Sequence, residues 1–372
     1  MNDTLQRKAD LDTPCLALDL DILDQNLRKM QALTQRAGKH LRPHAKTHKC
    51  STLARRQMEA GAIGICTAKV SEAEALCRAG IANILITGPV VTKQKIARLV
   101  ALRAKAPALM VVVDHPGPID LLSTALGDQG LTMDVLLDVD VGLHRTGVPP
   151  SIAINLADHI LDHSNLRLRG IQAYAGQMQH VRSYNERKNG SHQCLQPAIG
   201  IFRALQAKAP TCTVFSASGT GTSDIDLDIP ELTELQAGSY VCMDAEYLAI
   251  GSAEDNSRFT AFGPALRLLT TVVSVNQDGY VTVDAGLKAL YRDGAVPQII
   301  NPEYAGLRYD WFGDEYGRIT GSGSVGMPPL GTVLELVTSH CDPTINLFDR
   351  YYVTQGSKIV DTWSIDLRGC SQ

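Results

Sequence analysis

Apolar residues along the chain follow two patterns, and the change between them falls near residue 260. Before that point, short apolar runs alternate with stretches of helical spacing that end in Gly, such as "STLARRQMEAG" and "KVSEAEALCRAG". The runs predict eight strands, at residues 40–46, 62–68, 83–88, 108–114, 133–142, 168–176, 213–218 and 234–240. Eight strand–helix units predict a (β/α)8 barrel of the TIM type, with a doubly wound open sheet as the alternative.

The second pattern alternates apolar and polar residues and turns at Gly, Asp and Asn, as in "ALRLLTTVVSVNQDGYVTVDAG" and "DRYYVTQGSKIVDTWSIDL". It predicts an antiparallel β domain. The segment "TPCLALDL" is also strand-like but precedes the barrel strands, so it is free to pair with this domain. We therefore predict a barrel over residues 21–258 and a C-terminal β domain over 259–372, joined by the N-terminal segment 1–20.

Composition narrows the class of protein. With 372 residues, of which 44% are hydrophobic, the chain is large enough for two domains with buried cores. Its 39 acidic and 35 basic residues nearly balance, so we predict no nucleic-acid partner. The polar start, the short apolar runs and nine Cys without paired spacing predict a cytoplasmic protein with reduced thiols and no membrane partner.

A lysine stands where barrel enzymes hold their reactive groups. Lys46, in "LRPHAKTHKC", ends the first predicted strand, and the C-terminal ends of barrel strands carry the chemistry. The same ten residues contain four further basic side chains: Arg42, His44, His48 and Lys49. Such crowding would favour the neutral amine that imine formation requires, although a solvated basic loop is the alternative.

Two Gly-rich segments follow the last two predicted strands, "ASGTGTSD" (217–224) and "QAGSY" (236–240). Loops at these positions commonly cradle phosphate, because Gly lets backbone N–H groups approach the oxygens and hydroxyls add donors. The candidate residues are Gly219, Thr220, Gly221, Gly238, Ser239 and Tyr240. Either segment alone would be read as a turn, but together with Lys46 they indicate pyridoxal 5'-phosphate.

Seven motifs in order carry a family resemblance: "RPHAKTHK", "AKVSEAEAL", "VDVGLHRTGV", "IQAYAGQMQH", "ELQAGSY", "VDAGLK" and "SHCDPT". Together they resemble the D-threonine aldolase and D-serine dehydratase group, pyridoxal-phosphate enzymes with the barrel-plus-β-domain fold of alanine racemase. The resemblance implies that Lys46 is the Schiff-base lysine and that Arg145 lies near the phenolic oxygen of the cofactor. It also implies that Tyr174 lies beside the pyridine ring and that His180 is the acid–base group.

The motif "SHCDPT" (339–344) carries a candidate metal site. In an extended segment, His340 and Asp342 would share one face and Cys341 would point to the other. An imidazole and a carboxylate suit a divalent ion such as Mn²⁺, Mg²⁺ or Zn²⁺, whereas the motif by itself also reads as a turn. The resemblance implies that His340 and Asp342 are the metal ligands.

The resemblance implies retro-aldol cleavage of a β-hydroxy-D-amino acid of the D-threonine type to glycine and an aldehyde. An Asp two residues after the metal-binding His is typical of the aldolases, and a Cys there is typical of the dehydratases. Three alternatives stay open: a 3-hydroxy-D-aspartate aldolase, a D-serine or D-hydroxyaspartate dehydratase acting by β-elimination, and a pyridoxal-phosphate homeostasis protein without turnover. A second substrate carboxylate would need a cation, for which Arg42, His144 and Lys288 are the candidates.

Two positions depart from the pattern of the group. Ala68 stands where many of the aldolases have Gln, and Tyr316, in "DEYG", replaces a His. We expect these departures to bear on substrate choice more than on cofactor binding. The related fold usually places the β domain of one subunit at the barrel of another, so a homodimer is expected.

Overall fold

A computed structural model of the chain describes residues 7–321 and 325–372, so residues 1–6 of the predicted N-terminal segment lie outside the described part. The chain forms two compact units, which we describe separately. The barrel unit comprises Met30–Lys46, Leu53–Gly238 and Gly369–Gln372. The β unit comprises Met1–Lys29, Thr47–Thr52 and Ser239–Arg368.

The barrel unit contains an eight-stranded parallel sheet in the order β2-β9-β8-β7-β6-β5-β4-β3. Its strands are β2 (His40–Leu41), β3 (Ile65–Thr67), β4 (Ile84–Ile86), β5 (Met110–Val113), β6 (Met133–Asp138), β7 (Leu166–Ala173), β8 (Val214–Ala217) and β9 (Glu234–Leu235). The segment after β2 closes the sheet, because the N–H groups of Ile63 and Ala45 donate to Leu41 O and Cys66 O, both at 2.9 Å. All eight predicted strands are present, each shorter than predicted, and the predicted barrel fold is confirmed.

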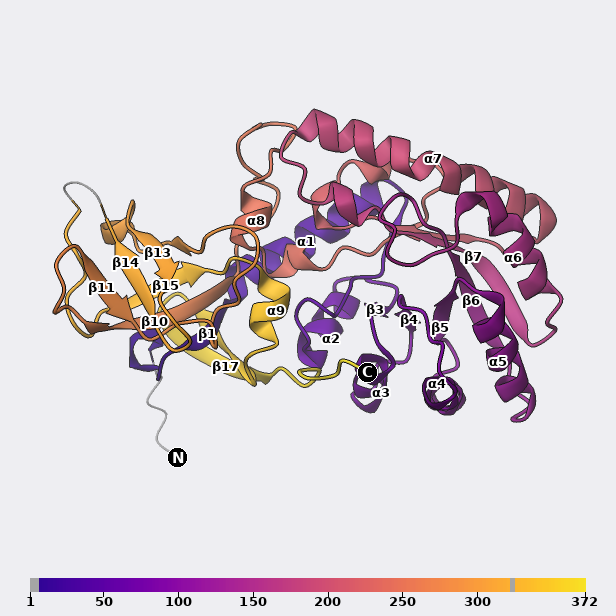
Figure 1. Cartoon of the computed structure of the whole chain (residues 1–372), viewed down its shortest axis with the longest axis horizontal. Coiled ribbons are helices and arrows are strands. Elements are labelled where there is room, and N and C mark those ends of the chain that lie inside the picture. The colour runs from indigo at the N-terminus through magenta and orange to yellow at the C-terminus, as the bar shows by residue number, and fades with distance from the viewer. Residues whose placement is uncertain (1–6, 322–324) are drawn as a thin grey trace. The chain divides into compact units, whose positions relative to one another are not determined.

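Helices cover the outside of this sheet (Figure 1). Those lying wholly in the barrel unit are α3 (Val70–Arg78), α4 (Lys93–Lys105), α5 (Pro116–Gly127), α6 (Ala153–Leu161) and α7 (Tyr184–Lys208). The helices α1 (Leu20–Arg36) and α2 (Ser51–Glu59) have residues in both units. Side-chain caps set some of their starts: the hydroxyl of Thr92 accepts from Lys95 N–H at the start of α4. Within the described residues, no helix is long and apolar enough to cross a membrane.

The barrel interior explains the continuous apolar runs of the sequence. Parallel strands are covered on both faces, so successive residues are apolar, and all four residues of β5 are buried. One core cluster joins four neighbouring strands: Cys66, Leu85, Met110, Val112 and Leu136. The nine cysteines are all free thiols and six of them are buried; their reduced state stays a prediction.

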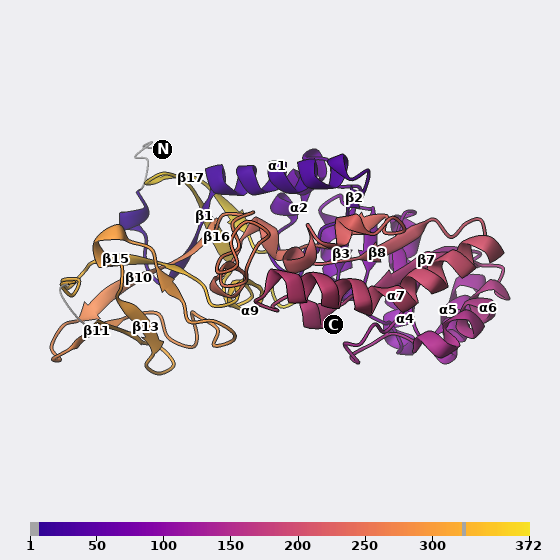
Figure 2. The ribbon, with the colours of Figure 1, turned by 90° about the horizontal axis from the view of Figure 1, so that it is seen from above.

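The β unit contains a nine-stranded sheet whose main order is β13-β14-β11-β10-β1-β16-β17, with β15 bonded to β10 and β12 (Figure 2). The strands are β1 (Cys15–Asp19), β10 (Leu266–Ser274), β11 (Tyr280–Val283), β12 (Gln298–Ile299), β13 (Arg308–Trp311), β14 (Gly317–Thr320), β15 (Val333–Val337), β16 (Arg350–Gln355) and β17 (Lys358–Ser364). β1 pairs antiparallel with β10 and parallel with β16. The N-terminal strand-like segment therefore lies in the middle of the C-terminal sheet.

Candidate active site

The residues predicted to hold the cofactor in the barrel unit all follow strand ends. Lys46 lies in the turn after β2, Arg145 in the loop after β6, Tyr174 directly after β7, and Gly219–Gly221 after β8. Because the eight strands are parallel, their C-terminal ends lie at one edge of the sheet. The structure therefore brings these residues to the edge where barrel enzymes hold their reactive groups.

His44 shapes the turn that presents Lys46. Its Nδ1 accepts a hydrogen bond from the backbone N–H of Lys46 at 3.3 Å, and its Nε2 lies 3.0 Å from the Thr87 hydroxyl. Since Nδ1 accepts, Nε2 carries the proton of the neutral ring and donates to Thr87. The Thr87 hydroxyl in turn donates to the carbonyl of Thr67 at 3.1 Å. The Lys46 side chain itself is exposed at this edge.

The positive charge expected around Lys46 is smaller than the sequence indicated. Arg42 is buried, and its guanidinium donates to both carboxylate oxygens of Glu234, at 2.9 and 3.1 Å. A third donor of Arg42 reaches the side-chain oxygen of Asn83 at 2.9 Å. A buried bidentate pair of this kind neutralises both charges. Arg42 is therefore part of the barrel interior and does not add charge beside the lysine.

The loop after β6 corrects the predicted strand over residues 133–142. The strand ends at Asp138, and the chain then turns around the carboxylate of Asp140. One oxygen of Asp140 accepts from two backbone N–H groups of the loop at 3.0 Å, and the other lies 2.7 Å from the His144 ring. Asp commonly organises turns in this way, so the apolar run is interrupted before it reaches residue 142.

This loop places Arg145 beside Tyr174. The guanidinium carbon of Arg145 lies 5.8 Å from the centre of the Tyr174 ring, within the range of a cation–π contact. Arg145 is exposed and Tyr174 is half-buried. The two residues come from the loops after β6 and β7 and are 29 positions apart in the sequence, so only the fold makes them neighbours.

A buried polar network crosses the inside of the barrel and was not predicted from the sequence. Gln172 donates to Asp138 at 2.9 Å, and Gln236 donates to the side chains of Gln172 and Ser216 at 3.0 and 2.9 Å. The Ser216 hydroxyl donates to Glu234 at 2.8 Å. Each of these side chains interrupts an otherwise apolar strand region, and that interruption is the signal that the sequence offered.

Asp138 gives a pH dependence to the stability of the fold. Burial raises its pKa from 3.8 to about 6, although Gln172 and Thr146 donate to it. The folded chain thus holds this proton more tightly than the unfolded chain, so stability falls as pH rises from about 4 to about 6. In the wild type, this effect lowers the free energy of unfolding by on the order of 3 kcal/mol between pH 4 and pH 7. Asp138→Asn should abolish this difference, which urea unfolding at the two pH values measures. Asp134→Asn, on the same strand, is the control and should keep the wild-type difference.

The Gly-Thr-Gly loop after β8 is built against Gln179. The loop forms a 3-10 turn, η4 (Thr220–Thr222), and the N–H of Gly221 donates to Gln179 Oε1 at 3.0 Å. A Cβ at Gly219 would lie 2.4 Å from Gln179 Oε1, and one at Gly221 would lie 2.1 Å from its carbonyl oxygen. Only glycine therefore fits at position 221, where the clash is with backbone, whereas a side chain at position 219 would displace the side chain of Gln179. Gln179 is a buried support that the sequence did not single out.

His180 directly follows Gln179 and lies in the turn after η3 (Gly176–Met178). The residue is half-buried. Because Gln179 is bonded to the Gly-Thr-Gly loop, the backbone at His180 is anchored to the same edge of the barrel. His180 stays the predicted acid–base group.

Gly238 ends the last long segment of the barrel unit, and the two other candidate residues of the "QAGSY" segment, Ser239 and Tyr240, belong to the β unit. Ser239 begins the 3-10 turn η6 (Ser239–Val241), and its carbonyl accepts from the N–H of Met243 at 2.7 Å. Tyr240 is fully buried, with its ring 5.6 Å from that of Phe262. The ring of Tyr240 is therefore part of a core.

The predicted extended geometry of "SHCDPT" is wrong. Residues Cys341–Ile345 form a short helix, α9, and His340 is its N-cap residue. The helix begins here because Asp in the first turn is favourable and Pro is tolerated there. Cys341 is buried and Asp342 is half-buried, and the thiol of Cys341 donates to Oδ1 of Asp342 at 3.6 Å.

His340 lies among carboxylates of the β unit. Its Nδ1 is 3.1 Å from Asp293, and its positive form lowers the pKa values of Asp244 and Glu246, which burial raises. Asp244 is fully buried, accepts from the backbone N–H of Cys341 at 3.0 Å, and so fixes the start of α9. The cluster offers imidazole and carboxylate donors, which suit a divalent cation.

The residues at the barrel edge also fit pyridoxal phosphate. Lys46 supplies an exposed amine, Tyr174 an aromatic ring and Arg145 a cation, and the η4 turn supplies threonine side chains. The N–H of Gly221 is already bonded to Gln179. In addition, the hydroxyl of Thr67 at the end of β3 is fully buried and has no hydrogen-bond partner in the described structure. Such a group indicates a polar ligand at this edge.

The structure shows one metal-type cluster that sequence analysis missed. Asp120, His159 and His163 hold their ligand atoms within 4.8 Å of one another on the outer helices of the barrel unit. The signal in the sequence was "HILDH", in which two His lie four residues apart, the spacing of one helical turn.

The class of protein is that of a parallel barrel with a separate β unit, and comparison with known proteins gives the family. A profile described as "Alanine racemase, N-terminal domain" matches residues 18–246, and a serine dehydratase domain profile matches residues 265–354. The first match covers more than half of the chain. The chain therefore belongs to the alanine racemase N-terminal domain family, whose members depend on pyridoxal phosphate.

Its relatives are lyases. The chain is 39% identical over 365 residues to a D-threonine aldolase of Arthrobacter sp, covering 98% of this chain and 94% of the relative. It is 34% identical to a 3-hydroxy-D-aspartate aldolase of Paracoccus denitrificans, covering 97% and 93%. The crystal structure of D-threonine aldolase from Filomicrobium marinum superposes with a TM-score of 0.93 at 35% identity, covering 100% of both chains. The chain is thus a lyase, and the homeostasis protein considered above is set aside.

Proposed function

We propose that this lyase cleaves a β-hydroxy-D-amino acid of the D-threonine type to glycine and an aldehyde by a retro-aldol reaction. The observation that carries the proposal is the 39% identity to D-threonine aldolase over 98% of the chain. Asp342, two residues after His340, supports an aldolase over a dehydratase, because the resemblance assigns an Asp to the aldolases at this position.

Each side chain of the barrel edge would have its own role in binding or catalysis. Lys46 would hold pyridoxal phosphate covalently, Arg145 and Tyr174 would orient it, and the Gly219–Gly221 turn would bind its phosphate. When bound, the cofactor supplies an electron sink for the pair released as a bond to the α-carbon breaks. His180 would remove the proton of the β-hydroxyl.

In the β unit, His340 and Asp342 would hold a divalent ion. A bound ion lowers the pKa of a coordinated hydroxyl, which favours cleavage of the α–β carbon bond. Asp342 is a hard oxygen ligand, which suits a labile ion such as Mn²⁺ better than a tightly held zinc. Manganese as the native ion and a homodimer as the assembly stay predictions.

The contacts of three basic residues favour a D-threonine-type substrate over 3-hydroxyaspartate. Arg42, His144 and Lys288 were the candidates for binding a second substrate carboxylate. Each already binds a carboxylate of the chain itself: Arg42 binds Glu234, His144 binds Asp140, and Lys288 binds Glu315. An added negative charge on the substrate would have to compete with these partners.

Product identification tests the proposal. The purified enzyme, supplied with pyridoxal phosphate and Mn²⁺, is incubated separately with D-threonine, D-phenylserine, D-3-hydroxyaspartate, D-serine and L-threonine. We expect glycine and an aldehyde from D-threonine or D-phenylserine, little pyruvate from D-serine and no turnover of the L-enantiomer. Preferred formation of glyoxylate and glycine would instead identify a hydroxyaspartate aldolase. A 2-oxo acid with ammonia would overturn the proposal in favour of a dehydratase.

A further inference from the structure

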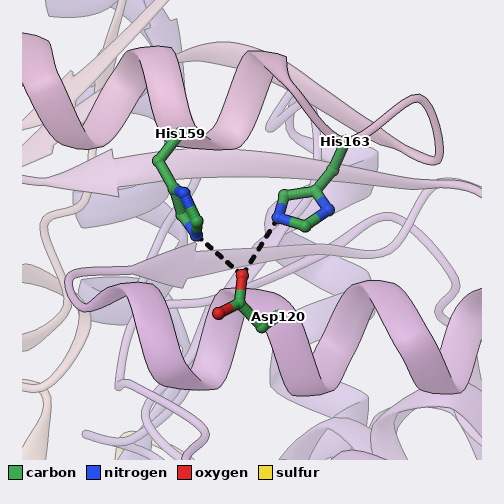
Figure 3. Close-up of side chains that lie close together, drawn as sticks. All are labelled: Asp120, His159 and His163. Atoms are coloured by element: carbon green, nitrogen blue, oxygen red, sulfur yellow. Dashed lines mark hydrogen bonds and ion pairs between the residues drawn. The ribbon is translucent and has the colours of Figure 1, made fainter.

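Three side chains of the barrel unit, two on outer helices and one just after α6, converge on one point (Figure 3). Asp120 lies on α5, His159 lies on α6, and His163 lies two residues after the end of α6. Oδ1 of Asp120 is 2.7 Å from His159 Nε2 and 3.1 Å from His163 Nε2. Both imidazoles thus present the same nitrogen to the same carboxylate oxygen.

The backbone holds these side chains in place before any ligand binds. The two histidines are four residues apart, and the helical turn continues past α6, because His163 N–H donates to Ile160 O at 3.1 Å. Beside them, Asn165 exchanges hydrogen bonds with Ser123: its Nδ2 donates to Ser123 O at 2.6 Å, and its Oδ1 accepts from the Ser123 hydroxyl at 2.7 Å. Ser123 lies one helical turn after Asp120, so these two bonds fix the spacing between α5 and the end of α6.

We propose that Asp120, His159 and His163 form a binding site for a divalent transition-metal ion of the zinc type, which links α5 to α6. Two imidazoles and one carboxylate favour Zn²⁺, Co²⁺ or Ni²⁺ over the hard ions Mg²⁺ and Ca²⁺, which prefer oxygen ligands. The ion would bind the two Nε2 atoms that face Oδ1, and each neutral ring would then carry its proton on Nδ1. Three protein ligands leave a fourth tetrahedral position for water.

The site needs only small movements to accept the ion. Zinc bonds of about 2.0–2.1 Å in tetrahedral geometry place ligand atoms about 3.3 Å apart. The two donor–acceptor distances here are 2.7 and 3.1 Å, so each imidazole must move away from the carboxylate oxygen by a few tenths of an ångström. The two Nε2 atoms lie within 4.8 Å of each other and must come to the same spacing of about 3.3 Å. The side chains of Asp120, His159 and His163 are 55, 35 and 24% exposed. The two imidazole rings meet edge to face at 87°. Partly exposed side chains of this kind have room to adjust.

This site is separate from the one proposed for catalysis. None of its residues follows a strand end, and none belongs to the β unit that contains His340 and Asp342. The inference does not rest on the proposed function. It predicts that the enzyme binds one ion more than catalysis requires, and that this ion affects stability and not turnover.

Metal stoichiometry tests the site. Chelator-treated wild type, His163→Gln and Asp120→Asn are dialysed against Zn²⁺, and the bound metal is measured by mass spectrometry. His40→Gln, which removes another exposed histidine, is the matched control. We expect each site variant to lose one zinc ion per chain, while His40→Gln binds as much as wild type. A second series in a His340→Ala background should show the same loss, which keeps the two sites distinguishable.

Two further measurements show whether a site variant is folded and whether the zinc ion binds at these three residues. Circular dichroism should show native secondary structure for both site variants, and their cleavage activity should match wild type. Zn²⁺ should raise the thermal midpoint of wild type and of His40→Gln but not of His163→Gln. Unchanged zinc stoichiometry in folded His163→Gln and Asp120→Asn would overturn the proposal and leave the three side chains as a hydrogen-bonded cluster only.

Discussion

Replacing Lys46 with alanine is expected to give a folded, colourless protein whose cleavage rate falls about 10⁴-fold or more. The amine of Lys46 is the proposed covalent attachment point of pyridoxal phosphate, so its loss removes both the yellow absorbance and the positioned cofactor. The side chain is exposed, so its removal should change the free energy of unfolding by about 0.5 kcal/mol or less. Absorbance spectra and initial rates with D-threonine measure the effect.

The attachment point can be read directly from a peptide map. Borohydride reduction of the wild-type enzyme, followed by proteolysis, should place the phosphopyridoxyl group on Lys46. Lys69→Ala is the matched control, because Lys69 is also exposed and also follows a strand end, that of β3. This variant should stay yellow and active. Labelling of Lys49 or Lys69 in the wild type would contradict the assignment.

Removal of the proposed ion is expected to stop turnover and leave the cofactor in place. His340→Ala and Asp342→Ala should each lower the cleavage rate by about 10²–10⁴-fold, because an ion that stabilises the β-oxygen contributes several kcal/mol to the transition state. Chelation of the wild type should do the same. The visible absorbance should persist in all three cases, since neither residue is proposed to touch the cofactor.

Two controls separate this ion from the one proposed on α5 and α6. Asp120→Asn should keep full activity before chelation and lose it after chelation, as wild type does. Mn²⁺ added back to chelated wild type should restore activity, whereas His340→Ala should not recover at the same concentration. Full activity of the chelated wild type with a β-hydroxy-D-amino acid would show that the metal role is wrong.

The sequence was sufficient for the architecture, because the covered faces of parallel strands produce apolar runs that local reading detects. It also placed Lys46 and the Gly219–Gly221 segment after strands, since strand ends and Gly-rich turns are local features. The motif resemblance then agreed with the family found by comparison. These predictions succeeded because each depended on residues within a few positions of one another.

Predictions from local sequence patterns were wrong where a single carboxylate ends a strand or starts a helix. Asp140 gathers two backbone N–H groups and ends the predicted strand over 133–142 early. Similarly, Asp244 binds the N–H of Cys341 and stabilises a helix where an extended segment was predicted. The sequence shows these carboxylates but not the groups that they bind.

Partners distant in the sequence were decided only by the tertiary structure. Arg42 looked like charge beside Lys46, but the fold brings Glu234, 192 residues away, into a buried bidentate pair with it. Asp120 lies 39 residues before His159, and only the packing of α5 on α6 joins them (Figure 3). The chain by itself determines which residue types are present and which local elements they form. Which charged residues contact one another depends on how the strands and helices pack in the folded barrel. This packing brings together residues far apart in the sequence, and no short stretch of the sequence shows it.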